Sequence, residues 1–184
     1  NLNTDSNEDK QLWQGLHEKI IDKEIALNPS PEDSFKIAAD GLNTPLIAIA
    51  KEVIAEHKIK NIRIIKKTLQ ALVEIMPKQN SLPESLYRAY IPTVIFLGIC
   101  YFRGFSNGLT LDYLANHIFM QPQESENEEW NVMINKFSIR ANKFSELAID
   151  YFRLGVTGHE DMALFFKPLK ENVQRAEFQN RLEA

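Results

Sequence analysis

Five cations within ten residues are the densest group of side chains in this sequence that can do chemistry. Lys58, Lys60, Arg63, Lys66 and Lys67 occur with no acidic residue among them. On a helix, Arg63, Lys66 and Lys67 share one face. Such a face can bind an anionic group, which would be a nucleotide phosphate, a nucleic-acid backbone or an acidic protein surface. A solvated helix face with no ligand has the same sequence pattern, so both interpretations stay open.

The residues just before this face predict a helix start. Asn61 is a favoured N-cap residue and precedes an apolar stripe at helical spacing. Arg63 would then lie in the first turn, where the free backbone amides add to a positive field. We therefore take Arg63, Lys66 and Lys67 as candidate anion-contacting residues.

Other reactive groups are scattered. The four histidines lie 40 to 60 residues apart, and none has metal-ligand spacing. His159-Glu160-Asp161 is typical of a polar helix start. Cys100 lies in the most apolar run, where a thiol is buried and unreactive. The sequence also contains neither a phosphate-binding Gly-x-x-x-x-Gly-Lys-Ser/Thr loop nor a Gly-x-Gly-x-x-Gly motif. We predict no catalytic residue, no metal site and no cofactor in this chain.

Composition narrows the class of protein. Of the 184 residues, 44% are hydrophobic and 25% charged, which is typical of a globular chain. The formal net charge of −4 argues against a nucleic-acid-binding surface over the whole protein. A single cysteine fits a reducing compartment, and residues 1–11 do not resemble a signal peptide. We expect a cytoplasmic protein whose partner is another protein and neither nucleic acid nor a membrane.

The elements that must position these residues are helices. Seven glycines and eight prolines are too few for the turns of a sandwich or barrel. Apolar residues recur instead at steps of three and four. The sequence predicts an all-α fold, an irregular bundle of seven to eight helices, with at most one short strand near 17–27. Residues 17–27 fit either a helix or a strand, and Asn28-Pro29 ends that segment.

Several helix boundaries can be predicted from capping residues and breakers. Ser30-Pro31, Thr44-Pro45 and Asn61 mark helix starts, and Pro77 and Gly155 mark ends. Capping boxes are predicted at 81–84, 125–128 and 157–160.

Two predicted helices are unusual. Residues 89–102 contain no charge, but they are too few to cross a bilayer and include Pro92, so they predict a buried central helix. Residues 128–154 keep an unbroken apolar spacing and predict the longest helix. A last helix follows, which Pro168 is expected to kink or divide.

Two stretches of the first half resemble a known group of proteins. Residues 17–29 (HEKIIDKEIALNP) and 60–69 (KNIRIIKKTL) are similar to the segment that follows the ATPase core in bacterial KAP-like and AAA-like P-loop NTPases. The match covers about residues 17–76, and many members of that group serve in phage defence. The resemblance implies that Asn61 and Arg63 are sensor residues of a helical lid. It also implies that ATP and Mg²⁺ bind to an upstream core that this chain lacks.

The polar first residues, a change from aliphatic to aromatic composition near 77–82 and this resemblance together predict a division of the chain. Residues 1–11 would be a frayed N-terminus, 12–77 a lid-like helical subdomain, and 78–184 a C-terminal helical subdomain packed on it. The first functional hypothesis is then a non-catalytic lid of a P-loop ATPase that senses nucleotide state and mediates assembly. The alternative hypothesis is a stand-alone helical protein–protein interaction module, acting as an adaptor or regulator. Either hypothesis permits an oligomer.

Overall fold

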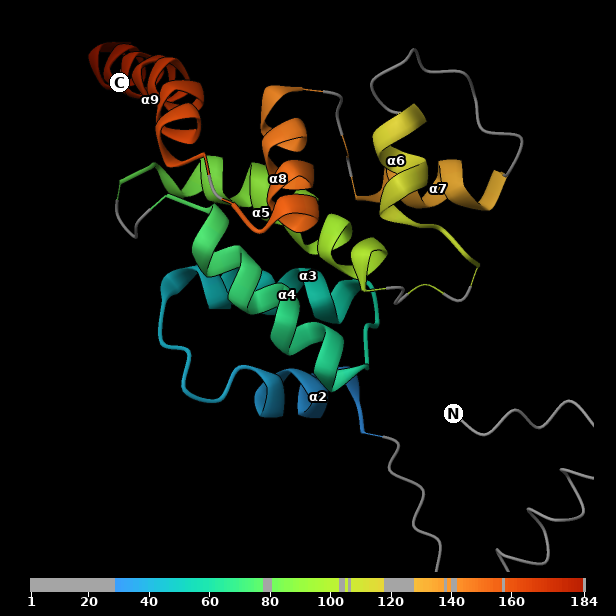
Figure 1. Cartoon of the computed structure of the whole chain (residues 1–184). Helices are drawn as coiled ribbons and strands as arrows, with labels where there is room; N and C mark the ends of the chain where they lie inside the picture. The colour runs from blue at the N-terminus through green and yellow to red at the C-terminus, as the bar shows by residue number, and fades with distance from the viewer. Residues whose placement is uncertain are drawn as a thin grey trace, which may run out of the picture.

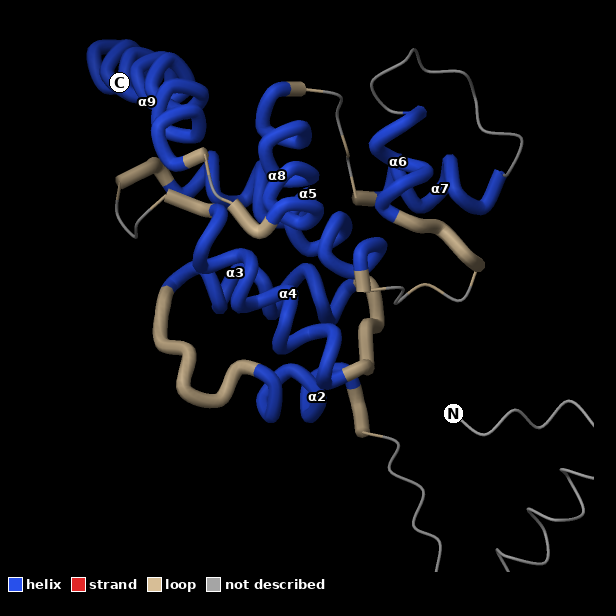
Figure 2. The backbone as a smooth tube through the Cα atoms, in the orientation of Figure 1, coloured by secondary structure: helices blue, strands red, loops and turns tan. Residues whose placement is uncertain are grey.

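The computed structural model describes residues 29–77, 81–102, 105, 107–117, 128–137, 139, 142–156 and 158–183. Over these residues the chain forms eight helices and no strand, which confirms the all-α prediction and the predicted helix count (Figures 1 and 2). The segments 1–11 and 17–27 lie outside the described residues. The helices are α2 (Pro31–Ala38), α3 (Pro45–Glu56), α4 (Ile62–Ile75), α5 (Glu84–Tyr101), α6 (Leu111–His117), α7 (Glu128–Lys136), α8 (Lys143–Leu154) and α9 (His159–Glu183).

Helices α2 and α4 begin where their capping residues predict. The Ser30 hydroxyl accepts a hydrogen bond from the Asp33 amide at 3.0 Å. The Asn61 side chain accepts one from the Ile64 amide at 3.2 Å. Each bond satisfies a backbone donor that the first helical turn leaves free. The boundaries of both helices therefore follow from local sequence.

Helix α5 is the centre of the bundle, as predicted. It packs against α3 and α4 on one side and α8 on another, and its residues from Thr93 to Cys100 are all buried. Figure 1 shows α2 at the lower end of this arrangement and α9 at the upper end. None of the helices in the described part is long and apolar enough to cross a membrane.

One buried cluster of apolar side chains runs from Phe35 in α2 to Phe166 in α9. It includes residues on both sides of 77–82, where we predict a boundary between subdomains. The division into 12–77 and 78–184 stays a prediction. Most of the aromatic residues belong to this cluster or pack against it, as their spacing indicates.

The prediction of one continuous helix over 128–154 is wrong. The chain leaves the helical path after Lys136 and starts α8 at Lys143. Phe137 is buried and stacks on His57 with ring centroids 3.6 Å apart. Asn142 caps the second helix by accepting the Ser145 amide at 3.0 Å. Burial of Phe137 and the competing N-cap thus divide a stretch whose apolar spacing looks continuous.

The predicted capping box at 81–84 is also wrong. Pro83 occupies the N-cap of α5, and the Ser81 hydroxyl has no hydrogen-bond partner among the described residues. The Glu84 carboxylate instead accepts a hydrogen bond from the Arg88 guanidinium at 2.8 Å. An ion pair one turn along the helix therefore replaces the expected contact with the backbone. The boxes at 125–128 and 157–160 include residues outside the described part.

Pro168 does not divide the last helix. Helix α9 continues through it from His159 to Glu183. Proline removes one amide and leaves the carbonyl of Leu164, four residues earlier, without its helical donor. Leu164 is 67% exposed and Pro168 is exposed too. Water can therefore satisfy that carbonyl, and the helix persists.

Candidate functional site

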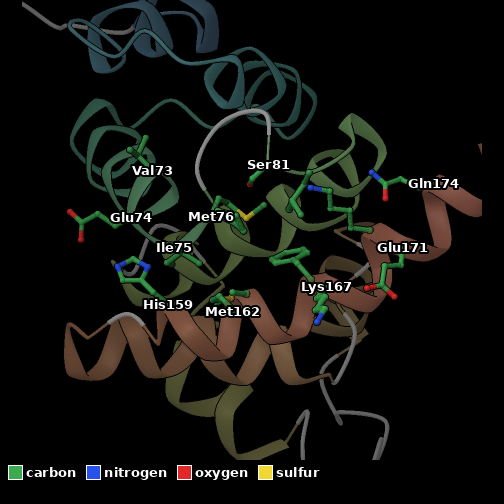
Figure 3. A pocket seen from close by; sticks show the side chains of 15 residues that line it. Val73, Glu74, Ile75, Met76, Ser81, His159, Met162, Lys167, Glu171 and Gln174 are labelled. Atoms are coloured by element: carbon green, nitrogen blue, oxygen red, sulfur yellow. The ribbon is translucent and has the colours of Figure 1, made fainter.

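A groove of about 1000 Å³ lies between the end of α4, residues 81–82 and α9. Figure 3 shows residues of α4 on one side and residues of α9 on the other. Its apolar lining includes Val73, Ile75, Met76, Met162, Ala163 and Phe166. Its volume is about twice that of the hollow beside His57, which is about 450 Å³.

The fold explains why this groove is apolar. Met162 and Phe166 are one helical turn apart on the side of α9 that faces the bundle, and both are buried. Met76 caps the C-terminus of α4 and is also buried. Val73 is 38% exposed, so the apolar surface continues toward solvent. Two methionines give the lining flexible side chains that can adapt to a bound surface.

The acidic and basic side chains at the rim of the groove differ in whether they have partners among the described residues. Glu74 accepts a hydrogen bond from the Tyr151 hydroxyl at 2.6 Å. Glu171 lies 4.0 Å from the Arg175 guanidinium. Neither Lys167 nor Lys170 forms an ion pair with any described residue. Both acids of the rim therefore have a partner within the chain, whereas Lys167 and Lys170 line the groove without an ion pair to a described residue.

The candidate anion-contacting residues lie at the other end of α4 from the groove. Arg63 and Lys66 are exposed and form no ion pair with a described residue. Lys67 lies over the Phe102 ring, with its ammonium 5.0 Å from the ring centroid. Asn61 caps the helix, so its side chain has a structural role that requires no ligand. The structure thus brings Arg63 and Lys66 together on one surface and gives Asn61 and Lys67 contacts within the chain.

A second hollow of about 450 Å³ lies beside His57 and Arg88. Burial, with Lys136 as a lesser cause, lowers the pKa of His57 below its ordinary value. Arg88 is held by Glu52 at 2.6 Å and Glu84 at 2.8 Å. The stacked histidine and the neutralised arginine make this hollow a structural junction of α3, α5 and α7.

No described cluster provides reactive chemistry. Cys100 is buried, and its burial raises the pKa of the thiol, which disfavours the nucleophilic thiolate. Within the described ranges, no three His, Cys, Asp or Glu side chains are grouped to hold a metal ion.

Comparison of the chain with protein-family models, with curated proteins and with solved structures found no match. The relation to KAP-like P-loop NTPases and the sensor roles of Asn61 and Arg63 stay predictions. The site is therefore assigned from geometry alone.

Sequence reasoning did not find the groove. Its two walls come from segments about 90 residues apart, around Val73 and around Met162. One signal was present, because Met162, Phe166, Leu169 and Val173 recur at helical spacing beside the lysines. That pattern predicts a buried face and cannot show that a neighbouring helix leaves part of it uncovered.

Proposed function

We propose that this chain is a non-catalytic helical interaction module that binds another protein in the α4–α9 groove. The observation that carries the proposal is the groove itself, which has an apolar lining and a volume of about 1000 Å³. A concave apolar surface with a few polar groups at its rim is the usual form of a binding site.

The free half of α9 supports the same function. Residues Gln174–Arg181 are exposed throughout, and Phe178 is 64% exposed. This part of the helix extends beyond the bundle in Figure 1. A partner in the groove can therefore also contact the projecting half of α9. An exposed aromatic side chain next to an apolar groove is typical of protein-binding surfaces.

The test uses three versions of the full chain as baits in cells that naturally contain it. Ala163→Arg places a long charged side chain in the groove, because Ala163 is an exposed residue of its lining. Leu164→Arg is the matched control, since Leu164 is 67% exposed and does not line the groove. We expect a partner that the unchanged chain and the control retain and that Ala163→Arg loses.

The purified partner must then show the same ranking in a direct binding measurement. Equal binding by all three versions would place the interface elsewhere. Absence of any partner common to the unchanged chain and the control would oppose the interaction module as a whole.

A second candidate function is the lid of a P-loop ATPase, and the exposed cations at the start of α4 favour it. Arg63 projects from the first turn and forms no ion pair with a described residue. It is thus available to a phosphate bound by another domain, whose developing negative charge an arginine stabilises. ATP and Mg²⁺ would belong to that other domain.

This second candidate is tested in the longer protein that the resemblance implies. Arg63→Ala should lower ATP turnover at least tenfold, whereas Arg175→Ala on the projecting half of α9 should leave it unchanged. Equal turnover in both variants would remove the sensor role from Arg63.

A further inference from the structure

We infer that the occupant of the α4–α9 groove is an amphipathic helix with acidic residues beside its apolar stripe. The inference rests on the proposed function and adds the chemistry of the partner. It follows from the length of the groove, its lining and the two lysines at its rim.

The groove has the length of a short helix. Its lining on α9 runs from His159 to Gln174. At 1.5 Å per residue this wall is about 22 Å long, which matches a partner helix of about 15 residues. The opposite wall is the last turn of α4 with residues 81–82. The long helical wall of α9 beside an apolar floor favours a helix whose apolar residues recur at steps of three and four.

The charges of the rim select the partner. Lys167 and Lys170 are one turn apart on the same wall, and neither has an acidic partner among the described residues. On the same wall Glu171 lies 4.0 Å from the Arg175 guanidinium. Glu74, on the opposite wall, accepts a hydrogen bond from Tyr151 and keeps its negative charge. A partner with two acids one turn apart can meet both lysines, whereas a basic partner would place like charges together.

The probe is a fluorescent helical peptide of about 15 residues. It carries leucines at helical spacing and two glutamates one turn apart along the edge of the leucine stripe. A second peptide has lysines in place of the glutamates and is otherwise identical. Affinity for the purified full chain is measured by fluorescence anisotropy at low and at physiological salt.

We expect the glutamate peptide to bind about tenfold more tightly than the lysine peptide, with a difference that shrinks as salt screens the charges. The double change Lys167→Glu and Lys170→Glu should reverse this preference. The control double change, Lys36→Glu and Lys51→Glu, alters the net charge equally at exposed sites away from the groove. It should leave the preference as it was.

The possible failures point to different conclusions. Ala163→Arg must abolish binding of the glutamate peptide, and Leu164→Arg must not. If both peptides bind equally and Ala163→Arg still blocks them, the groove binds helices without the charge preference, and this inference fails while the proposed function stands. If neither peptide binds, or if Ala163→Arg leaves binding intact, both the inference and the groove assignment fail.

Two other occupants would also overturn the inference. If sedimentation showed that the unchanged chain self-associates and that the Ala163→Arg variant is a monomer, the occupant of the groove would be a second copy of the chain. If Trp13→Asp instead raised the affinity for the peptide about tenfold, the groove would belong to the chain's own N-terminal segment. That segment would compete with the peptide in the unchanged chain. Unchanged affinity and a monomer in sedimentation support an external acidic helix.

Discussion

Replacing Gly98 with alanine tests the close contact of α5 with α4 and α8. Gly98 lies in the middle of α5, where a methyl group would lie 2.9 Å from both Cγ2 and Oγ1 of Thr68 on α4. It would also lie 3.1 Å from Cζ of Phe152 on α8. Thr68 is β-branched, buried and unable to rotate away freely. The three helices must therefore separate slightly to admit the methyl group.

The expected destabilisation is the difference between two opposing effects. Alanine is better than glycine inside a helix by about 1 kcal/mol. Inserting a methyl group into a tight core costs about 1–3 kcal/mol, and two contacts at 2.9 Å place this site in the upper part of that range. The net loss should be about 1–2 kcal/mol. In a domain of this size that corresponds to a decrease in Tm of about 2–8 °C.

Urea unfolding followed by circular dichroism measures this loss, with Thr68→Ala as the partner change. Thr68→Ala removes both threonine atoms that the new methyl group meets. It loses no hydrogen bond to a described residue, because the buried Thr68 hydroxyl has no such partner. The double variant Gly98→Ala with Thr68→Ala should therefore regain about 1–2 kcal/mol relative to the sum of the single changes.

Two results would refute this reasoning. If Gly98→Ala stabilised the chain by the full helix-propensity gain of about 1 kcal/mol, α4 and α5 would have to be farther apart than described. A double variant whose free energy of unfolding equals the sum of the single effects would mean that Thr68 is not the obstructing residue.

Three further predictions concern other described residues. Asn142→Ala removes the side chain that accepts the Ser145 amide at 3.0 Å and should lower the urea-unfolding free energy by about 1 kcal/mol. Cys100 in the native chain should react with a thiol reagent far more slowly than in the urea-unfolded chain at the same pH, because burial raises its pKa. The pKa of His57 is lowered from 6.5 in the native chain by burial and Lys136, so the unfolded chain binds the proton first as the pH falls. Native stability, measured as the urea midpoint, should therefore decrease as the pH falls below about 6.5, and His57→Gln should remove that part of the decrease.

Each of these predictions has a contradicting result. Unchanged stability of Asn142→Ala would mean that the cap of α8 contributes nothing. Equal reaction rates of Cys100 in native and unfolded chains would show that α5 opens readily to solvent. An identical pH profile for His57→Gln would place the acid sensitivity in another group.

The helices could be predicted largely from local signals. Ser30 and Asn61 cap α2 and α4 as expected, since an N-cap bond joins residues only three apart. Gly155 ends α8 in the left-handed conformation that glycine adopts without strain, with a φ of 70°. The uncharged stretch around Pro92 became the buried central helix, because a segment without a polar face can be covered on all sides.

Errors arose where a distant residue competes with a local pattern. The apolar spacing through Phe137 gives no sign that this ring leaves the helix to stack on His57, some 80 residues earlier. Likewise, Arg88 pairs with both Glu84 and Glu52, so the Glu84 carboxylate contacts a guanidinium and not the backbone that the capping box predicts. Helix α9 continues through Pro168, so a division there is excluded and the kink stays a prediction.

The sequence by itself determined that this chain is helical, where most of its helices begin and end, and which faces are apolar. Those properties depend on residues within a few positions of one another. Only the tertiary structure decided that Val73 and Met162 both line one groove. It also decided that Glu74 pairs with Tyr151, while Lys167 and Lys170 have no acidic partner within the part of the chain that the structure describes. Contacts between segments far apart in the chain depend on how all the helices pack together, because each helix can bury its apolar face against several alternative neighbours.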